Sequence, residues 1–214
     1  MQPRATGRVL RTPRGETFTF DAGALCLDFA HTGGEGRYAV FETLLEPADL
    51  VAWLAEPPLS AVVTVPVGAD DLADAKRLRQ AFWDAAQAVA AGRTPPADAV
   101  ARINAAARHP ALVPQLVTPP THTTADRPAA HPALDVTWDR PVALAQALST
   151  LARECVDLLS GPDVGRIRQC ASDDCPLVFV DTSRPGSRRW CSMGRCGNRS
   201  KLRAFRARRH EESG

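Results

Sequence analysis

Two stretches near the end of the chain decide its fold: CASDDC at residues 170–175 and CSMGRC at residues 191–196. Each is a C-x4-C pair, and the fifteen residues between the pairs can form a small β-hairpin. Four sulfur ligands with no histidine among them favour Zn²⁺ in a closed, tetrahedral structural site. Buried free cysteines or two disulfides are the alternatives, but paired short spacings in an intracellular chain usually indicate metal. We therefore predict one structural zinc ion bound by Cys170, Cys175, Cys191 and Cys196.

The N-terminal segment has no apolar run. Residues 1–14 are polar and include four arginines, and no stretch of the chain approaches the ~20 apolar residues that a membrane span needs. We therefore expect a cytoplasmic protein with no membrane partner, in a reducing compartment where thiols stay free to bind metal. The two remaining cysteines, Cys26 and Cys155, lie singly in apolar segments, and we expect them to be small buried hydrophobic residues.

Charge is divided unevenly along the chain. The 214 residues are 44% hydrophobic and 23% charged, as in an ordinary globular protein, and the net charge is only +2. Residues 161–214, however, hold twelve basic against six acidic residues, whereas residues 1–160 hold fourteen basic against eighteen acidic ones. An acidic body with a basic end favours a polyanionic partner, nucleic acid before a membrane surface. Arginine dominates these cations, which suits phosphate or guanine contacts but is also typical of GC-rich genomes.

Strand patterns lie near the start of the chain. Residues 16–21 alternate apolar and polar, Ala22 and Gly23 supply a turn, and the LCLDF stretch at residues 25–29 resumes the alternation. We expect a short β-hairpin here, or a strand that runs into the next segment. The glycine-rich loop at residues 31–36 has neither the Lys-Ser/Thr of a P-loop nor the G-x-G-x-x-G pattern, which argues against a nucleotide site.

Helical periodicity dominates the rest of the body. Helices are expected from Pro47 to Pro57, from Asp70 to Gly92, from Pro95 to His109 and from Pro141 to Gly161. Residues 111–118 and 133–138 could pair as two strands around the proline-rich loop 119–132. The predicted fold class is therefore α+β. It has a predominantly helical N-terminal domain over residues 15–161, with a short β-hairpin and a possible second strand pair, followed by a small treble-clef-like zinc finger over residues 162–210.

Within the finger, a strand at residues 166–170 should deliver the first ligand. Residues 177–181 and 188–191 read as the two strands of the hairpin, and helix formers follow Asn198. The N-terminus of that helix would lie at the metal, where its dipole stabilises a four-thiolate site. Leu202 and Phe205 share a face that we expect to pack on the hairpin. A module this small has almost no core, so we expect chelation to unfold it while the body stays folded.

No catalytic constellation is evident among the five histidines, and neither H-E-x-x-H nor G-x-S-x-G occurs. Asp28 and His31 could form an acid–histidine pair, but we expect Asp28 to cap a turn and His31 to lie at the surface or at a hinge. We therefore expect a protein that is not an enzyme. An enzyme with its site in the helical body remains an alternative.

The stretch WCSMGRCGNR at residues 190–199, followed by an Arg-rich helix, resembles the CGNR zinc-finger family of bacterial proteins. Five upstream residues also fall where that family's pattern has them: Cys170, Cys175, Phe179, Asp181 and Arg189. The N-terminal part looks like the ABATE domain that usually precedes this finger, because residues 25–32 match its leucine–cysteine–leucine–aspartate–phenylalanine stretch leading into Asn-Thr, with His31 in place of the Asn. Such proteins are described as stress-induced transcriptional regulators, so the resemblance implies DNA binding.

We thus predict a bacterial DNA-binding transcription regulator whose finger and basic helix contact nucleic acid. The expected contacts are Arg184, Arg188, Arg189, Arg199, Lys201, Arg203, Arg206, Arg208 and Arg209. One alternative is a zinc-finger module that binds a protein or RNA, since treble clefs serve all three uses. The body could also sense a small molecule through loop 31–36 or loop 119–132, although no residue pattern names the ligand. The basic helix could instead be a solvated face packed against an acidic body.

Overall fold

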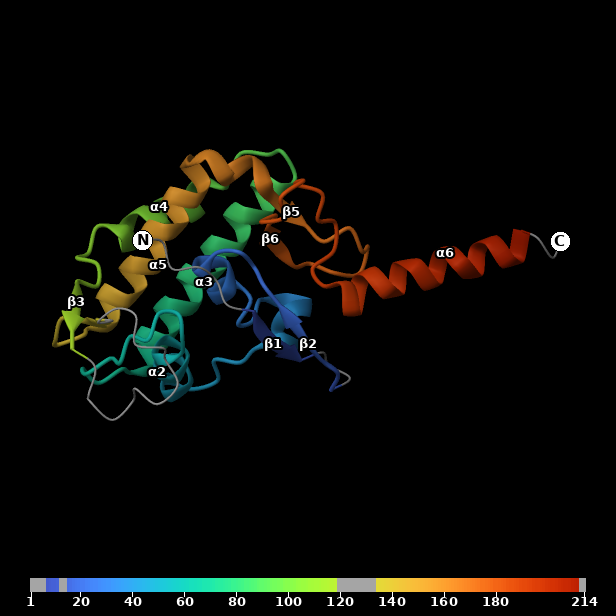
Figure 1. Cartoon of the computed structure of the whole chain (residues 1–214). Helices are drawn as coiled ribbons and strands as arrows, with labels where there is room; N and C mark the ends of the chain where they lie inside the picture. The colour runs from blue at the N-terminus through green and yellow to red at the C-terminus, as the bar shows by residue number, and fades with distance from the viewer. Residues whose placement is uncertain (1–6, 12–14, 119–133, 212–214) are drawn as a thin grey trace.

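The computed structural model of the chain describes residues 7–11, 15–118 and 134–211, with the backbone alone for residues 36–38, 204, 207, 208, 210 and 211. Helices dominate the described residues, and short antiparallel strand pairs accompany them, so the α+β prediction is confirmed. We call residues 7–161 the body and residues 162–211 the C-terminal module. Figure 1 shows the two parts, with the last helix extending away from both.

Four long helices build the body where helical periodicity predicts them: α2 (Pro47–Ala55), α3 (Ala69–Ala90), α4 (Ala97–Ala107) and α5 (Leu144–Ser160). Helix α3 is central because it packs against each of the others. Its buried residues Leu78, Phe82 and Ala86 recur every four positions along one face. Helix α5 begins three residues after the predicted Pro141, since Val142 is held extended by backbone and side-chain hydrogen bonds with Thr64.

The described strands form three two-stranded antiparallel pairs. They are β1 (Arg8–Arg11) with β2 (Thr17–Phe20), β3 (Pro114–Val117) with β4 (Asp135–Trp138), and β5 (Ile167–Gln169) with β6 (Val178–Val180). The β3–β4 pair confirms the predicted pairing around loop 119–132, and that loop lies outside the described residues. The predicted hairpin strand near Phe18 is β2, but its partner is β1 rather than residues 25–29.

Residues 25–29 are helical, so the expectation of an extended segment is wrong. Helix α1 (Leu25–Ala30) buries all six of its residues, and a helix buried all round shows no helical periodicity in its sequence. Glu154 of α5 stabilises its first turn. Its carboxylate accepts hydrogen bonds from the backbone N–H groups of Leu25 (3.1 Å) and Cys26 (2.6 Å). The helix is therefore capped by a residue that is 128 positions or more away in the sequence.

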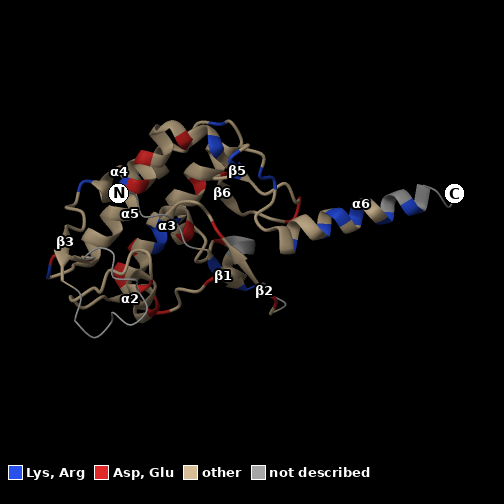
Figure 2. Cartoon of the chain, viewed as in Figure 1, with Lys and Arg blue, Asp and Glu red and all other residues tan. Residues whose placement is uncertain are grey.

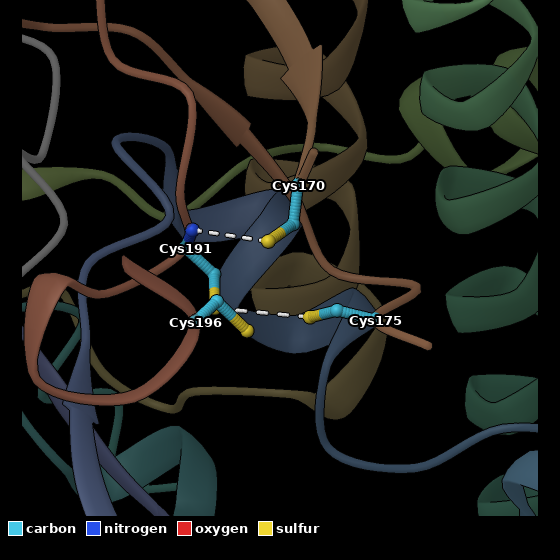
Figure 3. A group of neighbouring side chains, drawn as sticks. All are labelled: Cys170, Cys175, Cys191 and Cys196. Atoms are coloured by element: carbon cyan, nitrogen blue, oxygen red, sulfur yellow. Dashed lines mark hydrogen bonds between the residues drawn. The ribbon is translucent and has the colours of Figure 1, made fainter. Parts of the chain in front are cut away.

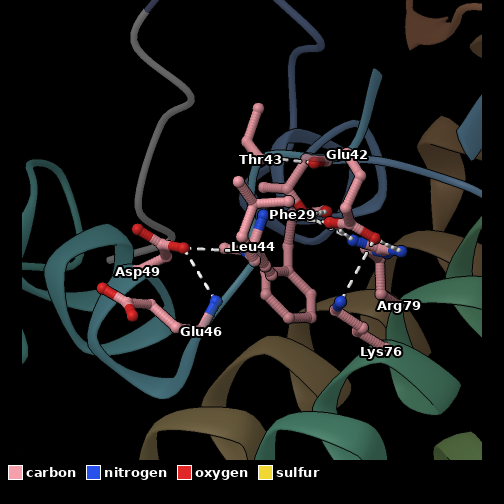
Figure 4. Close-up of polar contacts among 10 residues, drawn as sticks. Phe29, Glu42, Thr43, Leu44, Glu46, Asp49, Lys76 and Arg79 are labelled. Atoms are coloured by element: carbon pink, nitrogen blue, oxygen red, sulfur yellow. Dashed lines mark hydrogen bonds and ion pairs between the residues drawn. The ribbon is translucent and has the colours of Figure 1, made fainter. Parts of the chain in front are cut away.

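A short 3₁₀ helix, η1 (Gly36–Phe41), follows α1 and leads to a polar network on α3. Arg79 of α3 donates two hydrogen bonds to Glu42, at 2.7 and 2.8 Å, and Lys76 lies 3.5 Å from the same carboxylate (Figure 4). Glu42 also accepts the backbone N–H of Leu44. This network fixes the chain between α1 and α2, beside the C-terminal module.

The body and the C-terminal module share one hydrophobic core. After the 3₁₀ helix η3 (Pro162–Arg166), the pair β5–β6 packs against α3, and Ile167 and Phe179 are fully buried. The backbone N–H of Val180 donates to Ala22 at 2.8 Å. Gly23 permits this approach: its φ is +77°, and a Cβ there would lie 3.0 Å from Val180. Both free cysteines predicted to be buried, Cys26 and Cys155, lie in the core.

Candidate metal centre

Two tight loops bring the four cysteines together. The first follows β5, where the Cys170 N–H donates to the Leu177 carbonyl (2.9 Å) and the Cys175 N–H donates to that of Ser172 (2.9 Å). The second leads into a single π-helical turn, η4 (Met193–Gly197), which places Cys196 at the start of helix α6 (Asn198–Glu211). All four side chains are buried and converge on one point (Figure 3).

The spacing of the sulfurs suits a tetrahedral ion. The four Sγ atoms all lie within 4.8 Å of one another, and those of Cys175 and Cys191 are 3.7 Å apart. Zinc–sulfur bonds of ~2.3 Å in a tetrahedron separate the sulfurs by about 3.8 Å. All four cysteines are free of disulfides, so four thiol groups are available as ligands. A soft, four-sulfur donor set of this geometry fits zinc, which would supply structural cross-linking.

The electrostatics of the cluster also favour a cation. Hydrogen bonds from the Cys175 and Cys191 thiols lower the pKa of Cys170 to about 2. The Cys170 sulfur in turn raises the pKa of Cys175 to about 12 and that of Cys191 well above its usual range. Without a cation, the cluster therefore favours the deprotonation of Cys170 and disfavours the deprotonation of Cys175 and Cys191. A divalent cation removes this conflict because it stabilises every thiolate at once.

Polar groups around the cluster stabilise its negative charge. The backbone N–H of Cys191 donates to the Cys170 sulfur (3.4 Å), and Arg199 donates to the Cys196 sulfur (3.3 Å). The bond to Cys196 raises the pKa of Arg199 above its usual value. Asp174 then holds Arg199 from the other side, at 3.1 Å. The arrangement ties the first turn of α6 to both cysteine loops. The start of α6 therefore lies at the cysteine cluster, where the sequence predicts the metal.

The C-terminal module lacks the predicted hairpin between residues 177–181 and 188–191. Strand β6 pairs with β5 instead, and residues 188–191 are not a strand. The reason is the buried carboxylate of Asp181. It accepts the backbone N–H and hydroxyl of Ser183 and the backbone N–H of Arg188 (2.8 Å), which closes residues 181–188 into a loop. The backbone N–H of Arg188 is therefore not available to a sheet.

The predicted nucleic-acid contacts whose side chains the structure describes fall into two groups, exposed and bound within the molecule. Most have exposed side chains: Arg184, Arg189, Lys201, Arg203, Arg206 and Arg209. Arg188 instead points inward, because its guanidinium lies 4.0 Å from the Phe179 ring centroid and donates to the carbonyls of Asp21 and Cys191. Arg199 is bound at the metal centre, and the side chain of Arg208 lies outside the described residues. Asp181 is predicted only as a match to the CGNR pattern, with no role, and nothing in the sequence singles out Asp174; the structure places both carboxylates in contacts that organise the two sides of the centre.

Two apolar residues of α6 depart from prediction. Leu202 and Phe205 were expected to pack on a hairpin, but their side chains are 49% and 50% exposed. The base of α6 is held by ion pairs. Asp174 contacts Arg199 and lies 3.7 Å from Arg203, and both arginines belong to the first two turns of the helix. The rest of the helix extends away from the molecule (Figure 1).

Asp28 and His31, three residues apart in sequence, contact different partners. The side chain of Asp28 is buried, and its carboxylate lies 4.0 Å from Arg8. His31 is partly buried rather than fully exposed: its Nε2 hydrogen-bonds the Val178 carbonyl of β6 (2.8 Å), and its ring packs edge-on against Phe20. His31 therefore joins the body to the C-terminal module.

Comparison with known families agrees with this arrangement. The family model of the ABATE domain, described as "Putative stress-induced transcription regulator", matches residues 23–162. The chain belongs to the ABATE family. The model of the CGNR zinc finger matches residues 166–209, so the finger follows the ABATE domain as the resemblance implies. A search of curated proteins finds no match.

The CGNR match and the geometry of the four cysteines together fit one structural zinc ion, bound by Cys170, Cys175, Cys191 and Cys196. The ABATE domain and its finger contain no described helix that is long and apolar enough to cross a membrane.

Proposed function

We propose that this ABATE-family protein is a DNA-binding transcription regulator of the bacterial cytoplasm, in which the zinc-bound module presents α6 to the duplex. One observation carries the proposal: α6 leaves the molecule as a single projecting helix along which Lys and Arg positions recur (Figure 2), and its Lys201, Arg203, Arg206 and Arg209 side chains are exposed. Its sequence holds six Lys and Arg residues and one acid, Glu211. The proposed role is one of binding, not of catalysis.

Dimensions and charge support a role in the major groove. A helix of 14 residues is about 21 Å long, and the major groove of DNA is about 12 Å wide and admits an α-helix. Lys201 and Arg206 make no ion pair with another described residue, so they are available for phosphates. Arg184 and Arg189, exposed near the base of the helix, extend the basic surface.

The inward-facing arginines have a different part in this proposal. Arg188 donates to the carbonyls of Asp21 in the body and Cys191. Arg199 donates to the Cys196 sulfur, so we assign both arginines to holding the base of α6 and not to touching nucleic acid. Asp174 contributes to the same task through its contacts with Arg199 and Arg203. The helix is thereby oriented at its base and open to a partner along its length.

The test is the salt dependence of DNA binding by the zinc-loaded, full-length chain. Each phosphate contact releases about 0.9 counterion, so affinity should fall steeply with salt concentration. Replacing Arg203 and Arg206 with Ala should weaken binding and reduce the slope of log K against log salt by roughly two. Zinc content should be unchanged.

The matched control replaces two exposed arginines of the body, Arg93→Ala and Arg102→Ala, which changes the net charge equally. This control should bind DNA like the wild type. Equal binding by the control, the α6 variant and the wild type would contradict the proposal.

The exposed Leu202 and Phe205 favour one alternative, a protein partner that covers an apolar strip of α6. That alternative forecasts a defined protein whose capture is lost in Phe205→Ala and kept in the double arginine variant. It also forecasts weak DNA binding at low salt only. An RNA partner would show as stronger binding to single-stranded RNA than to duplex DNA at the same salt concentration.

A further inference from the structure

A cavity of about 800 Å³ lies where the body meets the C-terminal module. Its walls come from the β1–β2 hairpin, the loop after α1, helix α3 and the first cysteine loop. Apolar and aromatic side chains line much of it: Leu10, Phe18, Phe41, Trp83 and Leu177. A volume within the range of small-molecule sites and walls of this kind are typical of a ligand pocket.

Most charges around the cavity are already neutralised or hydrated. Glu42 is held by Arg79 and Lys76, and Asp174 is held by Arg199. Glu35, Asp173 and Arg11 are exposed to solvent. The His31 ring is buried, and burial lowers its pKa to about 4, so it is neutral at pH 7.

Arg195 differs from these groups. Arg195 belongs to the second cysteine loop, and its side chain is partly buried. Its guanidinium lies 4.6 Å from the centroid of the Phe18 ring of β2, and both residues line the cavity. None of the ion pairs among the described residues involves Arg195. A cation–π contact does not use up the N–H donors of a guanidinium, so a carboxylate beside the Phe18 ring can accept them.

We propose that this cavity binds an amphipathic organic anion: a molecule with an apolar, ring-bearing body and one carboxylate, whose acid group pairs with Arg195. The aromatic walls accept the body of such a ligand, and the unpaired cation selects its charge. A neutral ligand of the same shape would leave Arg195 partly desolvated and unpaired, which disfavours it.

The position of the cavity gives the ligand contacts with both parts of the molecule. Arg195 and Leu177 belong to the C-terminal module, whereas Phe18 and Trp83 belong to the body. A ligand in this place therefore binds only when the two parts are docked. Because it binds the docked form alone, it should raise the thermal stability of the zinc-loaded protein.

The probes are 2-naphthoate, a two-ring carboxylate, and its neutral isostere 2-naphthamide, titrated by calorimetry into the zinc-loaded, full-length protein. Naphthoate should bind the wild type at least about fivefold more tightly than naphthamide. In Arg195→Gln its dissociation constant should rise about tenfold, while that of naphthamide should change less than about twofold. Phe41→Ala, which removes part of the apolar wall, should weaken both ligands alike.

Arg184→Gln is the matched control, because it removes an exposed arginine of the same module outside this cavity. It should leave both affinities unchanged. The wild-type comparison needs no variant and so decides the matter even if Arg195→Gln fails to bind zinc. Equal affinity for the two probes, or no binding of naphthoate at 1 mM, would overturn the proposal. The titration contains no nucleic acid, so its result is independent of the proposed DNA binding.

Discussion

Asp28 and His31 lie three residues apart, and burial shifts their pKa values in opposite directions. Burial raises the pKa of Asp28 to about 7, although Arg8 lies 4.0 Å away and its positive charge opposes the shift. Burial lowers the pKa of His31 to about 4, against the hydrogen bond to Val178. Both groups are therefore neutral inside the protein near pH 6, where their unfolded counterparts are charged or partly charged.

This pair predicts opposing contributions to the pH dependence of stability. Between about pH 4 and pH 7, Asp28 holds a proton only in the folded state, so its contribution to the free energy of unfolding falls as pH rises. His31 binds a proton only in the unfolded state between about pH 4 and pH 6.5, so its contribution falls as pH decreases. Each slope is at most about 1.4 kcal/mol per pH unit.

Urea unfolding at pH 5 and pH 7 should separate the two effects. Asp28→Asn should gain stability with rising pH relative to the wild type, and His31→Gln should lose stability with rising pH relative to it. Asp70→Asn, at an exposed position of α3, is the control and should parallel the wild type. Parallel pH profiles for all four proteins would show that neither group is held neutral by the fold.

Residue identity and spacing predict the metal ligands but not these buried groups. Two C-x4-C pairs are a local pattern, and the four cysteines that they name do converge. The burial of Asp28 depends on β1 and α5, which lie far from it in sequence, and no local pattern reports such a contact. The inward orientation of Arg188 is hidden for the same reason, since Asp21 and Phe179 determine it.

At the scale of elements, the long helices of the body were predictable because each has one apolar face and one polar face. Helix α1 was not predictable in this way. Its sequence LCLDFA has apolar residues at alternate positions, as a strand does, and as a helix it is buried on every side, so no polar face marks it. Tertiary contacts decide between the two structures. Residues 188–191 likewise read as a strand from their composition, but the hydrogen bonds of Asp181 hold the chain in a loop.

Helix α1 should therefore depend on its cap from α5. Replacing Glu154 with Ala leaves the N–H groups of Leu25 and Cys26 without their acceptor, and each partly buried, unsatisfied donor costs about 1–3 kcal/mol. We expect urea unfolding to show a loss of about 2–6 kcal/mol for the two donors together. Asp157→Ala, an exposed acid one turn away on the same helix, should change stability by less than about 0.5 kcal/mol. A loss of similar size in both variants would mean that Glu154 acts through charge alone.

At the scale of the whole molecule, the C-terminal module shares its hydrophobic core with the body. The short length of the finger predicts that it has no hydrophobic core of its own, and its buried apolar residues do belong to the core of the body. Its apolar residues Ile167, Val178 and Phe179 complete the core of the body. Hydrogen bonds from Gln87 to Pro176 (2.7 Å) and from Arg188 to Asp21 (2.9 Å) cross the same boundary. Local sequence patterns do not report such packing, because the contacting residues lie far apart in the sequence.

Zinc removal should consequently destabilise the whole molecule, whereas the sequence alone predicts that the body would stay folded. Loss of the ion breaks the loops that hold β5 and β6 on α3, and it thereby uncovers Phe20, Ala22 and α1. In thermal unfolding followed by far-ultraviolet circular dichroism, a strong chelator should lower the Tm of the single helical transition. Cys196→Ser should reproduce the shift, and added zinc should restore only the wild type. Hydrogen exchange should show protection falling in α3 along with the C-terminal module. An unchanged helical transition after complete removal of zinc would mean that the body folds by itself and that the shared core adds little to its stability.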